Sequence, residues 1–167
     1  MSSLNYGFLL NLELYNAVIV FSLGGDKEGI IDFVKDNTKE GSGIPEMLKE
    51  QLPDLNEDRF YGQCSQFEDP EVFLVWLKEF DPSVPGDLGC MAHELFHLTI
   101  HLLDSRGAKL DPDNHEPFAY LNGYLHQVVN EAVNTALKEK EDALIEKEPS
   151  ISGVKLVDLK CDNFKLG

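Results

Sequence analysis

The sequence predicts a single α+β domain, in which a small antiparallel or mixed N-terminal sheet packs on a central helix and on a second long helix. Runs rich in β-branched and aromatic residues occupy the N-terminal half, whereas apolar residues at helical spacing follow the proline-containing break at 81–86. The chain has 167 residues, 43% of them hydrophobic, which is enough for one core. We expect the domain to span 1–148 and a C-terminal tail to span 149–167.

Local patterns predict the first elements. Leu9 to Tyr15 and Val18 to Leu23 are strand-like runs separated by Asn16-Ala17, which favours a hairpin or a kinked strand. After a pair of glycines, Asp26 is a candidate N-cap for a short amphipathic helix that reaches Asn37.

The middle of the chain predicts a helix and a second hairpin. Pro45 falls in the first turn of a second short helix, which ends at Pro53. Two strand-like runs, Arg59 to Phe67 and Glu71 to Phe80, lie on either side of a turn. Because Val72 to Leu77 is nearly all apolar, we expect this strand to be covered on both faces, or covered on one and used on the other.

Two long helices are predicted in the C-terminal half. The first runs through Met91 and ends at Gly107, a candidate C′ residue. The second begins at Asn114 or His115 and continues to about Lys147, with a proline in its first turn. For the tail, two alternatives stay open: one more strand, Val154 to Leu159, or no regular structure.

The charge of the chain limits its partners. Lys and Arg number 14 against 30 Asp and Glu, a formal net charge of −16, which repels phosphate backbones and anionic lipid surfaces. We therefore expect no direct binding to nucleic acid and no membrane partner. A chain this acidic could instead mimic DNA and occupy a basic groove on another protein, so that alternative stays open.

The cysteines and the N-terminus favour a cytoplasmic protein. The three cysteines, Cys64, Cys90 and Cys161, are an odd number without repeated spacing, which does not predict a disulfide framework. The apolar stretch from Tyr6 to Gly25 lacks a preceding basic region and contains Glu13. It is therefore predicted to be neither a signal peptide nor a membrane span.

The helix around Met91 carries the residues that point to chemistry. Apolar residues wrap most of it, whereas His93, Glu94, His97 and His101 fall on one polar stripe. His93 and His97 are one turn apart, so both imidazoles can reach one ion at about 2.0–2.1 Å. The segment is a His-Glu-x-x-His signature, HELFH, in which two histidines bind Zn²⁺ and the glutamate is a general base.

Catalytic zinc normally has a third protein ligand. The candidates are His101, His115, Glu116 and His126. His101 is about 6 Å further along the helix than His97, which favours a supporting or surface role. Glu116 is favoured because it opens the next helix, 116 − 97 = 19 residues on, and because Ala119 and Gly123 on the same face would let two helices approach closely.

Two further side chains have alternative roles. Tyr120, one turn after Glu116, is a candidate catalytic residue that donates a hydrogen bond to a developing oxyanion, or it packs between the helices. Cys90, one turn before His93, is favoured as a small buried thiol over a metal contact.

HELFH followed by a glutamate that opens a second helix resembles the gluzincin type of zinc metallopeptidase. The runs FLVWLKEF, PGDLGCMAHELFH and DNHEPFAYLNGYL are similar to small metallopeptidase-like proteins of tailed bacteriophages, over Val72 to Leu125. The resemblance implies a zincin-like fold, zinc held by His93, His97 and Glu116, and Glu94 as catalyst. It also implies that Val72 to Leu77 is an apolar edge strand to which a substrate peptide adds.

The leading hypothesis is a zinc-dependent hydrolase, in which zinc-activated water and Glu94 cleave a peptide or another amide. The first alternative is a non-catalytic zincin-like structural or assembly protein of a phage particle, with phage structural proteins as partners. The second is the acidic DNA-mimic inhibitor. The first two place the chain in the cytoplasm of a bacterial host or in the virion.

Overall fold

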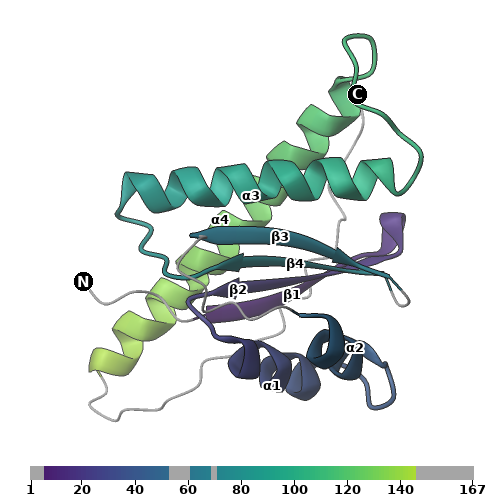
Figure 1. Cartoon of the computed structure of the whole chain (residues 1–167). Coiled ribbons are helices and arrows are strands. Elements are labelled where there is room, and N and C mark those ends of the chain that lie inside the picture. Colours follow the sequence, from purple (N-terminus) through teal and green to yellow (C-terminus); the bar gives the residue numbers. More distant parts are fainter. Residues whose placement is uncertain (1–5, 53–60, 69–70, 146–167) are drawn as a thin grey trace.

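The computed structural model describes residues 6–52, 61–68 and 71–145 of the chain (Figure 1). Its architecture is α+β, as predicted, with a mixed four-stranded sheet. The strands are β1 (Tyr6–Leu12), β2 (Ala17–Leu23), β3 (Gly62–Phe67) and β4 (Val72–Leu77). The helices are α1 (Lys27–Asn37), α2 (Ile44–Gln51), α3 (Pro85–Asp104) and α4 (Glu116–Ile145), with a 3-10 turn, η1 (Glu13–Tyr15), between β1 and β2.

The strands lie in the order β1-β2-β4-β3. β1 pairs with β2, and β3 pairs with β4, both antiparallel, so the first pair of runs is a hairpin rather than a kinked strand, and the second predicted hairpin is confirmed. β2 and β4 pair in parallel and join the hairpins into one sheet. The first strand begins at Tyr6 rather than Leu9. It ends at Leu12 rather than Tyr15, because the next residues form η1 and Asn16, whose φ of 47° is left-handed.

The expectation that Val72 to Leu77 forms an edge strand is wrong. β4 lies between β2 and β3, and β3 is the outer strand. All six β4 residues are buried: three alternate residues join the core on one face of the sheet, and the other three join the core on the opposite face. This explains the nearly unbroken apolar run, because a strand covered on both faces has no position for a polar side chain.

Helices cover both faces of the sheet (Figure 1). α1 and α2 pack on one face over a smaller core that includes Trp76, whose Nε1 donates to the Gly25 carbonyl at 2.6 Å. The predicted N-cap of α1 is confirmed, since the Asp26 carboxylate accepts from the Gly29 N–H at 2.8 Å. Pro45 lies in the first turn of α2, as predicted.

α3 and α4 cover the other face and enclose the larger core. α3 has 20 residues and begins at Pro85, whose missing N–H is not needed in a first turn. Gly107 ends the helix as predicted: its φ is 78°, its N–H donates to Asp104 O at 2.8 Å, and the Ala108 N–H donates to Leu103 O at 3.0 Å.

α4 crosses α3 where the Thr99 hydroxyl donates to the Asn122 side-chain oxygen at 3.3 Å. Leu121 and Leu125 supply the buried side of α4. Ala119 and Gly123 are exposed, so the expectation that they bring the helices close together is wrong. Phe118, Leu121 and Leu125 face the core instead. The predicted strand at 154–159 lies outside the described residues.

Within the described ranges, no helix is both long and apolar enough to cross a lipid bilayer.

Candidate metal site on the HELFH helix

The structure brings His93 and His97 together on consecutive turns of α3. Their Nε2 atoms are 3.0 Å apart, and the ring centroids are separated by 4.6 Å with the planes inclined at 79°. His93 is exposed and His97 is partly exposed. The pair therefore faces solvent and is open to an ion or to a partner's side chain.

The spacing of the two nitrogens fits zinc. Two ligand atoms about 2.0–2.1 Å from one tetrahedral zinc ion lie about 3.3 Å apart. The nitrogens of His93 and His97 need to separate only slightly from 3.0 Å to occupy two such positions. Both residues lie in the interior of a regular helix, so the backbone already holds the rings on one side.

Glu94 points in a different direction from the two histidines. Its side chain is only 8% exposed, and its Cγ would be 3.1 Å from a Cβ placed on Gly62, the first residue of β3. Successive residues of a helix are about 100° apart around the axis, so Glu94 turns toward the sheet while His93 turns toward solvent. The predicted polar stripe is thus divided between an exposed imidazole pair and a buried carboxyl.

Cys64 on β3 packs against the larger core, close enough to Glu94 for the two side chains to interact electrostatically. Burial raises the pKa of the Cys64 thiol, and the Glu94 carboxylate raises it further, to about 12. The thiol is therefore neutral near pH 7. A neutral, partly buried thiol is a poor nucleophile, so Cys64 is not a candidate for that role.

The other polar residues of α3 lie further from the pair. The ring centroid of His101 is 6.3 Å from that of His97, in keeping with a place beyond a shared ion. Cys90 is partly buried and packs against the larger core. In the part of the chain that the structure describes, no three His, Cys, Asp or Glu side chains gather closely enough to hold one metal ion.

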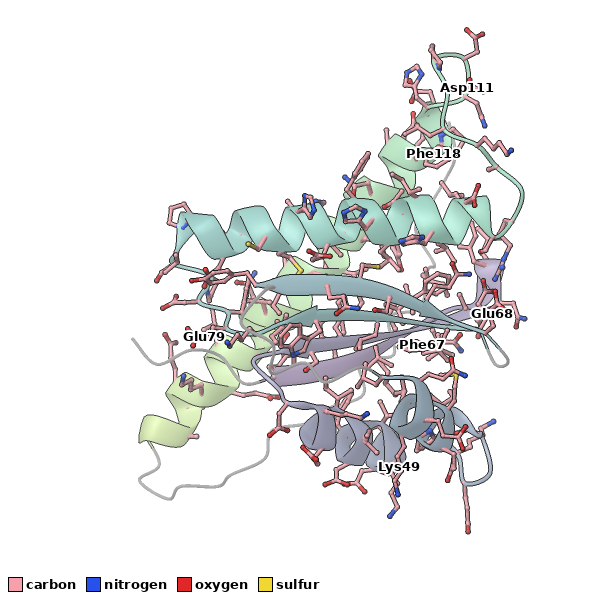
Figure 2. The ribbon with its side chains drawn as sticks, in the orientation of Figure 1. Lys49, Phe67, Glu68, Glu79, Asp111 and Phe118 are labelled. Atoms are coloured by element: carbon pink, nitrogen blue, oxygen red, sulfur yellow. The ribbon has the colours of Figure 1, made fainter. Side chains whose placement is uncertain are left out.

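Glu116 is not brought to the histidine pair. It opens α4, and its Oε1 lies 3.6 Å from Nε2 of His115, with both side chains largely exposed. It precedes the α3 contact at Asn122 by 122 − 116 = 6 residues, about 9 Å along the axis. Figure 2 labels Asp111, which precedes Glu116 in the chain and lies beyond α3 on the side away from the sheet, whereas Phe118, which follows Glu116, is buried in the larger core.

The two remaining candidates lie further along α4. Tyr120 is 56% exposed, so the alternative in which it packs between the helices is wrong. His126 is partly exposed on α4 and has no place in a three-residue metal group.

β3 presents an open edge beside this part of α3. The Lys78 N–H donates to Tyr61 O at 3.0 Å, and hydrogen-bonded pairs alternate along an antiparallel ladder. The backbone N–H and C=O groups of Gly62, Cys64 and Gln66 therefore point away from β4. No strand of the described residues pairs with that edge.

Gly62 was not predicted to be a residue of the site. A glycine at the start of a strand-like run was the available signal, because glycine in a strand often marks a close approach by another group. The sequence does not indicate which helix residue makes that approach.

Comparison of the chain with protein-family models, with curated proteins and with solved structures gives no match. The functional interpretation therefore depends on the geometry of α3 and β3.

Proposed function

We propose that the chain is a zinc-dependent hydrolase of peptide or other amide bonds, with His93 and His97 as zinc ligands and Glu94 as the general base. The observation that carries the proposal is the 3.0 Å separation of the two Nε2 atoms, directly beside a buried glutamate on the same helix. Zinc, when bound, supplies a Lewis acid and lowers the pKa of its water toward 7.

Glu94 would accept the proton of the attacking water and pass it to the departing amine. Two observations support this role: Glu94 directly follows His93 on α3, and its side chain is buried beside the outer strand β3. Tyr120 remains the proposed donor to the oxyanion, and its exposure leaves its ring accessible to a substrate.

The open edge of β3 would bind the substrate. An extended peptide could add to the outward backbone groups of Gly62, Cys64 and Gln66 as a fifth strand. Such a strand would run alongside α3, where Glu94 meets Gly62. The substrate-binding strand is thus β3, in place of Val72 to Leu77.

Glu116 remains the proposed third ligand. It would join the histidine pair only if the first turn of α4 moved, because in the described arrangement its carboxylate is beside His115. Such a movement would have to displace the first turn of α4, in which Phe118 is buried in the larger core.

We also propose that the fold is zincin-like. Three features support this: a mixed sheet, an outer strand antiparallel to its neighbour, and a HELFH helix packed on the sheet beside that strand. The phage origin suggested by the sequence resemblance remains part of the same proposal.

The test is cleavage of an unbiased peptide library by the zinc-loaded chain, with the Glu94→Gln variant as the comparison. The proposal expects cleavage by the wild type, and loss of cleavage with unchanged zinc content in the variant. Equal cleavage by both proteins would exclude Glu94 as the base, and no cleavage by fully loaded wild type would exclude the hydrolase.

A second candidate function is a zinc-binding assembly protein without catalysis. The observation that favours it is that only two of the three predicted ligands come together, on an exposed part of α3. A two-histidine clamp can be completed by a side chain of a partner protein. Zinc-dependent association of the chain, unchanged in Glu94→Gln and lost in His93→Ala, would support this alternative.

A further inference from the structure

The first residue of β3 is a glycine for a reason of space. The backbone φ of Gly62 is outside the left-handed region, so its conformation is open to any residue. Glycine in a strand normally weakens it, because glycine loses more conformational freedom and packs no side chain. The explanation for Gly62 must therefore be found in what surrounds it.

A side chain at position 62 would meet three groups. Its Cβ would lie 2.9 Å from Cδ2 of Leu77, 3.1 Å from Cγ of Glu94 and 3.2 Å from the carbonyl oxygen of Trp76. The Leu77 methyl belongs to a side chain 1% exposed, and the Trp76 oxygen belongs to the β4 backbone. Of the three groups, the stem of Glu94 is the one that can move away without disturbing the sheet.

From this geometry we infer that Gly62 is a positioning residue for Glu94: the missing side chain is the space in which the glutamate stem lies against β3. The catalytic meaning of this inference rests on the proposed function. The contact between Gly62 and Glu94 does not depend on that function. A methyl group at position 62 would push the stem outward and carry the carboxyl away from its place beside the sheet.

The contact is tested by a double-mutant cycle on unfolding free energy in the full chain, using Gly62→Ala and Glu94→Ala. Gly62→Ala should destabilise the wild type more than it destabilises the Glu94→Ala background, because that background lacks the Cγ atom. An equal cost in both backgrounds would overturn the inference. The cycle needs no activity, so it gives an answer even if the chain cleaves nothing.

The catalytic consequence is tested with the zinc-loaded chain once a cleaved peptide is known. Gly62→Ala should lower kcat on the order of 10- to 100-fold, with KM and zinc content unchanged, since a displacement of about 1 Å can have such an effect. Gly123→Ala is the matched control, because a Cβ there meets nothing within 4 Å. A raised KM with unchanged kcat would overturn the inference and assign Gly62 to substrate binding at the β3 edge.

Discussion

The Nε2 atoms of His93 and His97 lie 3.0 Å apart on consecutive turns of α3, on the solvent side of the helix. Glu94, between them in sequence, is turned away and buried against Gly62. The HELFH segment thus presents two imidazole nitrogens outward and keeps its carboxyl beside the open strand β3. The following predictions test separate parts of this arrangement.

The first prediction concerns the Cys64 thiol. Its pKa is raised to about 12, first by burial and then by the Glu94 carboxylate. Glu94→Gln should therefore lower the pKa of Cys64 while leaving it above the ordinary value of 9.0, because burial remains. Alkylation of Cys64 as a function of pH, followed by mass spectrometry of its peptide, measures the change.

The same shift predicts a pH dependence of stability. A pKa that is higher in the folded state means that the folded protein holds the proton more tightly, so unfolding free energy falls as pH rises from about 9 to about 12. Cys64→Ala should reduce that slope. An unchanged Cys64 pKa in Glu94→Gln would show that the carboxylate does not lie near the thiol.

The second prediction concerns the open edge of β3. The Gln66 N–H points away from β4, so Gln66→Pro removes no ladder hydrogen bond, whereas Ser65→Pro does. Ser65→Pro should lower the urea midpoint much more than Gln66→Pro.

Gln66→Pro should also raise KM for a peptide substrate, with Gln66→Ala as the control for the lost side chain. If KM is the same in Gln66→Pro and Gln66→Ala, substrate does not add at this edge.

The third prediction concerns a cross-link at the end of α3. Arg106 contacts the Glu71 carboxylate at 2.6 Å, and its Nε donates to Tyr15 O at 3.0 Å. These two contacts of Arg106 join the end of α3 to both hairpins. Arg106→Ala should lower the unfolding free energy by about 1 kcal/mol, the upper end for a partly exposed pair.

This cross-link should weaken in acid. The hydrogen bond from Arg106 is the largest cause of the lowered pKa of Glu71, so its stabilisation is present above the ordinary value of 4.5 and is lost as pH falls through the lowered value. Urea unfolding at pH 7 and at successively lower pH values measures this loss. If the difference between wild type and Arg106→Ala stays constant over that range, the pair does not contribute as described.

The fourth prediction concerns Glu116. If its carboxylate completes the zinc site, Glu116→Ala should weaken zinc binding at least about tenfold. Glu131→Ala, an exposed glutamate further along α4, is the matched control. Equal zinc affinity in Glu116→Ala and Glu131→Ala would remove Glu116 from the site and leave the histidine pair unaffected.

Features that depend on residues close together in the chain could be predicted from the sequence. The Asp26 cap, the first-turn proline of α2 and the Gly107 terminus each depend on a few adjacent residues. The spacing of His93 and His97 is likewise a property of one helix. These features were predicted because local patterns determine them.

Features that depend on distant segments were predicted less well. The parallel pairing of β2 with β4 makes β4 an inner strand, and no local pattern in Val72 to Leu77 distinguishes that from an edge. The contact of Thr99 with Asn122 fixes where α4 crosses α3 and leaves the start of α4 beyond the histidines. The approach of Glu94 to Gly62 likewise joins two elements distant in sequence.

The most direct test of zinc binding by His93 and His97 is a measurement of zinc content and zinc affinity. The full chain is purified without added metal, as the wild type and as His97→Ala. We predict about one zinc ion per chain in the wild type and in the control His101→Ala, and none in His97→Ala. A wild-type protein that binds no zinc, or a His97→Ala variant that binds it equally well, would contradict the central claim.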